Sequence, residues 1–389
     1  MKTIIKTFVA VIAFTVCVSF WTLCFATLFS GCAAVAEGKR ISLKIVNWNA
    51  QTFFDANNDG IEYSNFQKSK KWDEVAYKGR LKKLCDTIKV LDGDVVILEE
   101  IENEGILHDI SNALAGENWN PKKVYRYGCF SKKKNSSIGC AVISRYELFD
   151  FKIHSLDVRA ENSRAPSMRP LIEVDLLAAK NKFSDEKNSR TLKIFVNHWK
   201  SKSGGEEESK IWRRWQEGLL AQKISDAQND ATLPAIICAG DFNQDIMEFS
   251  FIEIESEDFL DAGADENAIL KTPHSDENVN FRKSQIEVKV ESKNFCNAPN
   301  IEFAMFDSRE KILVYSPWLE FPGEEGSYFF HDKWERIDHF FACGQIALKE
   351  FSPQTSGKWA YDDGRPKSFK IYSLNGYSDH LPIACIVEF

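Results

Sequence analysis

The chain has 389 residues, of which 44% are hydrophobic and 27% are charged, with a formal net charge of −8. This composition is that of a globular protein with a substantial core, and it excludes an intrinsically disordered chain. The acidic balance argues against a broad basic surface for nucleic acid, although lysine clusters such as residues 132–134 leave room for a local one.

The N-terminal segment is typical of an export signal. Lys2 and Lys6 precede an uncharged apolar run over residues 7–31, and Cys32 follows. This pattern predicts a signal peptide over residues 1–31. The sequence before Cys32 resembles a relaxed bacterial lipobox, which implies a lipid anchor on that cysteine. An uncleaved membrane anchor is the alternative, because the run is long enough to span a bilayer. We therefore expect an exported domain, tethered at the cell envelope or surface, or else secreted, with residues 32–40 as a linker.

Strand and helix patterns are mixed along the rest of the chain. Apolar spacing predicts helices over residues 72–91, near 106–114 and over 212–224. Period-two or short apolar runs predict strands at residues 41–49, 94–98, 123–130, 139–144, 149–156, 170–177, 191–198, 235–240, 311–315, 336–342 and 381–388. No fixed-period repeat is visible, so we predict one α/β (α+β) domain over residues 41–389, with a variable insertion near 261–330.

Polar side chains arrive where several of these strands end. The apolar run at 235–240 ends in Gly-Asp-Phe-Asn, which presents Asp241 and Asn243 on one side and turns Phe242 into the protein. Each polar residue alone has an ordinary explanation as a turn or helix-starting residue. Their recurrence predicts a single site, built from Asn49, Glu100, His198, Asp241, Asn243, Asp338, Asp379 and His380.

These residue types suit the cleavage of phosphate esters. Carboxylates such as Glu100 bind a hard cation such as Mg²⁺. Histidines stabilise or protonate developing charge, and asparagine donates to phosphate oxygens without adding net charge. A serine hydrolase lacks support because no Gly-x-Ser-x-Gly is present. No Cys-x-x-Cys pair indicates a zinc site, and a disulfide between Cys129 and Cys140 across a hairpin is one option.

Several motifs together resemble one family. NWNAQTFFD, VVILEEIEN, GCAVISR, VNHWKSK, ICAGDFNQD, ERIDHFF and GYSDHLP occur in the order and spacing of the endonuclease/exonuclease/phosphatase superfamily. This metal-dependent group includes DNase I and the abasic-site endonucleases, and the secreted bacterial nuclease-like members are the most similar. The resemblance spans residues 41–389 apart from the insertion. It implies a four-layer sandwich of two packed mixed β-sheets flanked by helices.

The resemblance also implies a role for each acidic residue of the site. Glu100 would ligate Mg²⁺, with Mn²⁺ or Ca²⁺ as alternatives, and Asp379 would contribute to a metal position. Asp241 would orient or deprotonate the attacking water, and Asn243 would stabilise the transition state. Many members carry a carboxylate where this chain has Gln51, which implies a weaker or single metal site.

The remaining matches fall on the substrate side. His380 would contact the scissile phosphate, with Asp338 orienting its ring, and His198 would be an acid at the leaving oxygen. Asn49 would help to hold the active-site network, and Arg169 stands where related enzymes place a substrate-side arginine.

The leading hypothesis is a lipid-anchored, Mg²⁺-dependent phosphodiesterase that acts as an endonuclease on extracellular DNA or RNA. A phosphatase or a phospholipid-directed phosphodiesterase of the same fold is the first alternative. A non-catalytic surface lipoprotein that binds a ligand is the alternative from another class.

Overall fold

A computed structural model describes residues 40–116, 120, 123–156, 166–179, 190–230, 234–250, 252–255 and 312–389. Within it, Ile41–Phe389 forms one compact unit. The predicted signal peptide, Cys32 and residues 261–311 of the predicted insertion lie outside the described residues. Among the described helices, none is both long and apolar enough to cross a membrane.

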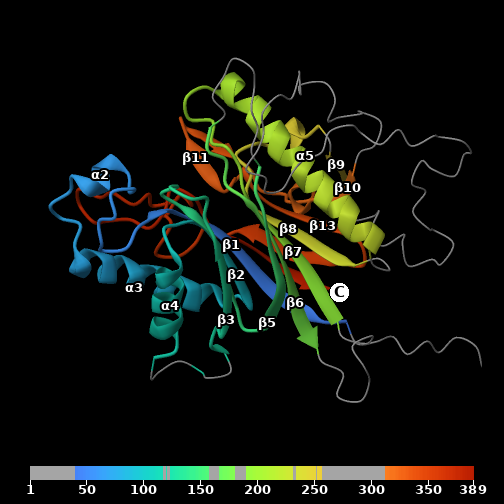
Figure 1. Cartoon of the computed structure of the whole chain (residues 1–389), viewed down its shortest axis with the longest axis horizontal. Coiled ribbons are helices and arrows are strands. Elements are labelled where there is room, and N and C mark those ends of the chain that lie inside the picture. The colour runs from blue at the N-terminus through green and yellow to red at the C-terminus, as the bar shows by residue number, and fades with distance from the viewer. Residues whose placement is uncertain are drawn as a thin grey trace, which may run out of the picture. The chain divides into compact units, whose positions relative to one another are not determined.

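Two mixed β-sheets form the centre of this unit (Figure 1). The first has the strand order β14 (Ala347–Pro353), β15 (Ile383–Glu388), β1 (Ser42–Phe53), β2 (Val95–Ile101), β4 (Gly139–Ser144) and β3 (Tyr127–Ser131). The second has the order β5 (Glu147–His154), β6 (Leu171–Ala179), β7 (Arg190–His198), β8 (Ala235–Asp241), β13 (Asp338–Cys343), β10 (Ile312–Tyr315) and β9 (Ile252–Glu255). Each sheet has a parallel central pair, β1 with β2 and β7 with β8, beside antiparallel neighbours.

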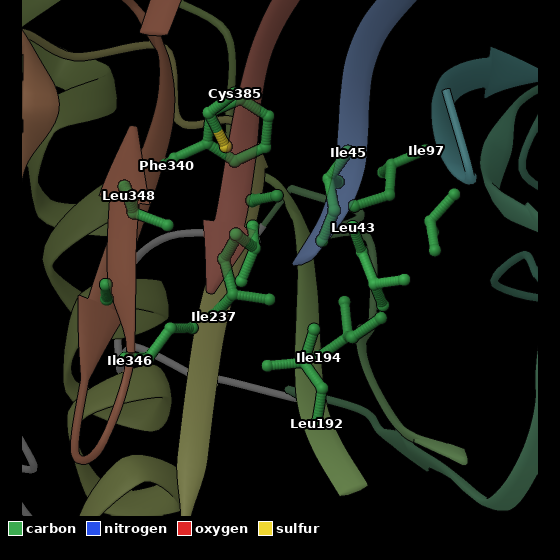
Figure 2. Packing of buried hydrophobic residues seen from close by; sticks show 14 of the residues in the cluster. Leu43, Ile45, Ile97, Leu192, Ile194, Ile237, Phe340, Ile346, Leu348 and Cys385 are labelled. Atoms are coloured by element: carbon green, nitrogen blue, oxygen red, sulfur yellow. The ribbon is translucent and has the colours of Figure 1, made fainter. Parts of the chain in front are cut away.

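The inner faces of the two sheets bury a continuous apolar core (Figure 2). Ile45 and Ile97 from the first sheet and Ile194, Ile237 and Phe340 from the second are fully buried. Alternate residues of each strand reach this core because side chains of a strand alternate between its faces. Each such side chain contributes about 1.5–3 kcal/mol through burial. The packed core therefore holds the strand ends of both sheets in fixed positions.

Helices cover the outer faces of the sheets, α3 (Glu74–Leu91) and α4 (Glu104–Leu114) on one side and α5 (Glu206–Asp230) on the other (Figure 1). Leu84 of α3 and Val96 of β2 belong to one buried apolar cluster, and Leu220 of α5 and Ile236 of β8 belong to another. The Asp73 side chain caps α3 by accepting from the Ala76 amide. Short helices α2 (Ser64–Gln67), η3 (Ile246–Glu248) and η6 (Pro317–Leu319) lie in connections. The four-layer sandwich predicted from the sequence is confirmed.

The structure adds strands that the sequence pattern did not indicate. They are β14, β9 and a separate hairpin of β11 (Tyr328–Phe330) and β12 (Lys333–Glu335). β10, inside the predicted insertion, pairs with β13 through Tyr315 and Ala342. The end of that segment, from residue 312, is thus part of the second sheet.

The cysteines are not paired in the described part of the chain. Cys129 lies opposite Val142 in the β3–β4 ladder, and Cys140 lies opposite Ser131. Both thiols are free, as are the other described cysteines. The disulfide between Cys129 and Cys140 is therefore a wrong expectation, because the hairpin register puts neither residue across from the other.

Candidate active site

Strand ends from both sheets meet at one edge of the sandwich. In the second sheet, His198 ends β7, Asp241 ends β8 and Asp338 begins β13. The ladder registers place His198 and Asp338 on either side of Asp241. Asn49 on β1 and Glu100 on β2 bring the first sheet to the same place. The recurring polar strand ends do form one cluster.

The backbone around Asp241 explains the Gly-Asp-Phe-Asn sequence. A Cβ atom on Gly240, whose φ is +142°, would stand 1.9 Å from the Asn197 carbonyl oxygen, so only glycine fits there. Asn243 has a φ of +51° in the left-handed region. Phe242 is fully buried with its ring centroid 4.7 Å from that of Trp199, as predicted. Glu100 also has a positive φ, of 63°, and strain of this kind gathers at functional sites.

Asn49 joins the two sheets through its side-chain amide. Its Nδ2 donates to Asp241 Oδ2 at 3.0 Å and to Glu100 Oε1 at 3.4 Å. The other Glu100 oxygen accepts from the Thr52 backbone amide at 2.5 Å. Asn49 therefore fixes the distance between the carboxylates of Asp241 and Glu100.

His380 and Asp338 form a buried pair beside Asp241. His380 Nδ1 lies 2.7 Å from Asp338 Oδ2, and its Nε2 lies 3.9 Å from Asp241 Oδ2. Burial alone would lower the pKa of His380, but the Asp338 and Asp241 carboxylates hold that pKa well above its usual value. The imidazolium form is thus favoured, and Asp338 orients it.

Asp241 is itself perturbed by this environment. Burial raises its pKa to about 7; His380 opposes this rise, the Asp338 carboxylate adds to it, and the hydrogen bond from Asn49 opposes it. A carboxylate with a pKa near neutrality can take up a proton during a reaction at neutral pH.

His198 differs from His380 in charge. Its Nε2 lies 3.6 Å from Asp241 Oδ2 and 3.9 Å from Glu100 Oε1, and its Nδ1 is buried without a partner. Burial, followed by the charges of Arg169 and His380, lowers the pKa of His198 well below its usual value. The neutral imidazole can donate one hydrogen bond, and its role as an acid stays a prediction.

Asn243 and Arg169 meet at one carbonyl. Asn243 Nδ2 donates to the Trp199 oxygen at 3.2 Å, and Arg169 Nη1 donates to the same oxygen at 3.0 Å. The Asn243 amide also donates to Asp241 Oδ1 at 2.9 Å. Burial raises the pKa of Tyr63, the Glu100 charge adds to this rise, and the nearby Arg169 charge opposes it. The structure therefore brings both predicted residues to the cluster, at the side where Tyr63 lies.

Asp379 lies at the other side of the cluster. It lines a cleft of about 320 Å³ together with Phe329, Tyr361, Arg365, Pro366 and Ser368. Burial raises the pKa of Asp379, His380 opposes that rise, and the Glu100 carboxylate adds to it. Two predicted metal ligands, Glu100 and Asp379, therefore influence each other electrostatically.

The cluster fits a hard divalent cation. Carboxylate oxygens dominate it, and within the described residues neither Glu100 nor Asp379 forms a salt bridge with a lysine or arginine. The ligand atoms of Asp241, Asp338 and His380 all lie within 4.8 Å of one another, and Asp338 Oδ1 is buried without a partner. Such oxygen-rich donor sets suit Mg²⁺, Mn²⁺ or Ca²⁺. The roles of Glu100 and Asp379 as the ligands of this ion stay a prediction.

Three further residues support the site but carry no clear sequence signal. Ser378 Oγ donates to the Asn49 carbonyl at 2.6 Å, and Glu99 is fully buried with both carboxyl oxygens unpaired. Arg80, on α3, donates to the carbonyls of Ala50, Gln51 and Thr52 and stacks 3.7 Å from the Phe369 ring. Arg80 stood inside a predicted amphipathic helix, where an arginine normally faces solvent, so its burial could not be inferred.

Comparisons with known proteins identify the family of the chain. A model of the Endonuclease/Exonuclease/phosphatase family matches residues 44–270, which is more than half of the chain. No curated protein matches the chain.

Solved structures with low sequence identity are also similar. They include truncated TDP2 of Caenorhabditis elegans, with 12% identity, 90% of this chain and 98% of that chain covered, and a TM-score of 0.47. An endonuclease/exonuclease/phosphatase family protein of Bacteroides thetaiotaomicron has 14% identity, coverage of 90% and 99%, and a TM-score of 0.47. A mannosyl-6-phosphatase of Bacteroides thetaiotaomicron has 14% identity, coverage of 89% and 100%, and a TM-score of 0.46.

Proposed function

Since the chain belongs to the endonuclease/exonuclease/phosphatase family, whose members hydrolyse phosphate esters, we propose that it is a divalent-metal-dependent phosphodiesterase that cuts DNA or RNA internally outside the cytoplasm. The observation that carries this proposal is the position of Asp241. Its carboxylate is within 4 Å of Asn49 Nδ2, His198 Nε2 and His380 Nε2.

The side chains divide the work of hydrolysis between them. Asp241, with a pKa of about 7, takes the proton of the attacking water. His380, kept charged and oriented by Asp338, donates to an oxygen of the phosphate that is cut. Asn243 has a second amide hydrogen beyond the one given to Trp199, and this hydrogen supports the charge that develops on the phosphorus oxygens.

Glu100 and Asp379 would hold the cation, which would supply positive charge to the phosphate oxygens. The Thr52 amide and Asn49 Nδ2 fix the Glu100 carboxylate before any substrate arrives. This preorganisation lowers the cost of reaching the reactive geometry.

Nucleic acid as the substrate is supported by an aromatic and cationic rim beside Asp379. Arg365 stacks over Phe329 at 5.1 Å, and Lys367 lies 5.4 Å from the ring of Tyr361, which is 53% exposed. Exposed rings stack on bases, and cations contact the phosphate backbone. No observation of comparable weight favours a phosphomonoester or a phospholipid.

A substrate panel tests this proposal. The full chain is incubated with supercoiled plasmid, single-stranded RNA, p-nitrophenyl phosphate and sphingomyelin vesicles, each with Mg²⁺, Mn²⁺, Ca²⁺ or EDTA. We expect metal-dependent nicking of plasmid or internal cuts in RNA, at rates above those on the monoester and the lipid. Faster hydrolysis of the monoester or lipid would overturn the nucleic-acid assignment, and no hydrolysis of any substrate would favour a ligand-binding lipoprotein.

Export and anchoring rest on the N-terminal sequence alone. We propose that the chain is lipidated on Cys32 and held at the cell envelope. Expression of the full chain in a bacterial host, followed by fractionation, should place the wild type with membranes and Cys32→Ser in the soluble fraction. Membrane retention of Cys32→Ser would instead indicate the uncleaved anchor.

A further inference from the structure

A second acidic cluster lies in the loop that follows β1. Asp59 and Glu62 belong to this loop, and Glu102 follows β2. Oxygen atoms of the three carboxylates lie within 4.8 Å of one another. Asp59 is exposed, whereas Glu62 is 7% and Glu102 only 1% exposed. This group shares no residue with the candidate active site.

One carboxylate oxygen of Glu102 has no hydrogen-bond partner. Its Oε2 accepts from the Asp55 backbone amide at 2.7 Å, but its Oε1 is buried without any hydrogen bond. One carboxylate oxygen of Glu102 lies within 4.8 Å of an oxygen of Asp59 and of Glu62. A buried carboxylate oxygen left in this state is costly unless a cation or a donor completes it.

No described lysine or arginine is ion-paired with these carboxylates, although burial raises the pKa of Glu102 and the charge of Lys132 opposes that rise. Neither Asp59, Glu62 nor Glu102 forms a salt bridge with any described lysine or arginine, although ion pairs occur elsewhere on the same sheet, such as Arg145 with Asp94. The Glu62 oxygens accept only from the backbone amides of Asp59 and Gly60. Each of these oxygens keeps a second lone pair for a further ligand.

We propose that Asp59, Glu62 and Glu102 form a calcium site. Calcium takes about six to eight oxygen ligands in flexible geometry, which three carboxylates with waters can supply. The loop sequence supports the choice, because Asp55, Asn57, Asp59 and Gly60 match the Asp-x-Asn-x-Asp-Gly opening of calcium-binding loops.

The site departs from the usual calcium loop at its closing ligand. The twelfth position, normally glutamate, is Phe66, which is buried in an aromatic cluster with Phe54. Glu62 and Glu102 provide the carboxylates instead. The ion thus ties the loop to the end of β2 rather than to a following helix.

The position of the loop gives the ion a structural role. Glu102 is two residues beyond Glu100. Tyr63, next to Glu62, lies near the candidate active site, since burial raises its pKa, the Glu100 charge adds to that rise and the Arg169 charge opposes it. Bound calcium would hold Tyr63 and the end of β2 in place. The expected effect is on stability and on the order of the substrate side, distinct from the catalytic ion at Glu100.

Calcium titration of the full chain tests this site. The measurements are isothermal titration with CaCl₂ and the Tm with and without CaCl₂, in a Glu100→Gln background that weakens the catalytic metal site. We expect one Ca²⁺ to bind and to raise the Tm, with Mg²⁺ binding more weakly. Glu102→Gln should abolish binding, and Asp59→Asn, at an exposed position that folding tolerates, should weaken it at least tenfold.

The control is Asp363→Asn, which removes an exposed carboxylate paired with Arg365 and should leave calcium affinity unchanged. Equal affinity in Asp59→Asn and the control would overturn the site. Loss of calcium binding on Glu100→Gln alone, or tighter binding of Mg²⁺ than of Ca²⁺, would overturn it too. None of these outcomes depends on the substrate of the enzyme, so a failure here is separate from a failure of the proposed function.

Discussion

The molecule contains two groups of buried carboxylates, and the negative charge of each group is compensated in a different way. In the candidate active site, Asp241 and Asp338 face His380, whose pKa is held well above its usual value. Glu62, in the loop after β1, and Glu102, after β2, form no ion pair with a described lysine or arginine, and Glu102 Oε1 has no hydrogen-bond partner. The first group carries its counter-charge within the chain. The second, on our proposal, takes it from solution.

The two groups also differ in the secondary structure that holds them. Asp241 and Asp338 lie opposite each other in a ladder of the central sheet, whose inner face is fully buried. Glu62 lies in a connection and reaches Glu102 across the gap between two segments. A site on packed strand ends is preorganised without ligand, whereas a site that joins two segments depends on its ion. Substitutions in each group and removal of the ion therefore test this contrast.

Removing the counter-charge of the first group should have the largest effect. His380→Ala should lower kcat by about a thousandfold, within the range for acid–base and charge-stabilising groups. Steady-state kinetics on a diester, with circular dichroism to check folding, measures it. His108→Ala, which removes an exposed histidine of α4, is the matched control. Comparable rates in both variants would remove His380 from the catalytic group.

Arg80 links the two groups, because it holds the end of β1 that leads from Asn49 into the acidic loop. Arg80→Lys keeps the charge but loses the fork that reaches the Ala50 and Thr52 carbonyls. Unfolding in urea should show a loss of about 3 kcal/mol, from carbonyls left without donors, and kcat should fall about tenfold through misplaced ligands.

Arg145→Lys provides the comparison for Arg80, since Arg145 is also largely buried and binds Asp92 and Asp94 at the opposite end of β2. It should cost stability without lowering kcat. Equal losses of kcat in the two variants would mean that Arg80 acts through general stability and not through the position of β1.

Chelation should separate the two ions. Adding EGTA at saturating Mg²⁺ should lower the Tm of the full chain by several degrees while kcat falls less than about threefold, because ligand removal costs the stabilisation that binding supplied. The Tm of Glu102→Gln should not respond to EGTA. A Tm shift of the same size in both proteins would place the calcium elsewhere.

The smallest effect is expected for Glu173, a carboxylate that belongs to neither group and that is paired with His154 and Lys193. Burial alone would raise the pKa of Glu173, but hydrogen bonds from His154 and Lys193 lower it to about 2. Its stabilisation is therefore present above the usual glutamate pKa of 4.5 and is lost as pH falls towards 2.

Urea unfolding of the wild type and Glu173→Gln between pH 6 and pH 3 measures this contribution. The variant should be less stable by under about 1 kcal/mol near pH 6, given solvent screening, and the difference should shrink with falling pH. A difference that does not change with pH would contradict the assigned pKa shift.

Much of the fold and the cluster could be predicted because local signals agree with the final packing. The apolar run before Gly240, for example, is both a strand signal and the buried centre of the second sheet. The sequence pattern did not predict β14, because β14 is an edge strand with Lys349 and Glu350 exposed in its middle. Its pairing with β15 depends on contacts distant in sequence, which no local pattern records.

The polar residues of the candidate site likewise divide into those with a local sequence signal and those whose position depends on distant contacts. Asp241 and His380 stand in distinctive motifs, so their meeting was inferred before the fold was known. The burial of Arg80 depends on the Phe369 ring and the β1 carbonyls, which only the folded chain brings together. Glu102 carries no distinctive sequence signal, and its unpaired oxygen is visible only in three dimensions.

The most direct test of the central claim is the initial rate of bis(p-nitrophenyl) phosphate hydrolysis by the full chain, with Mg²⁺ or EDTA, for the wild type and Asp241→Asn. With Asp241 as the base beside a bound metal ion, we expect hydrolysis that requires the metal and falls by about a thousandfold in Asp241→Asn. Hydrolysis that persists in EDTA, or that is equal in the two proteins, would contradict it.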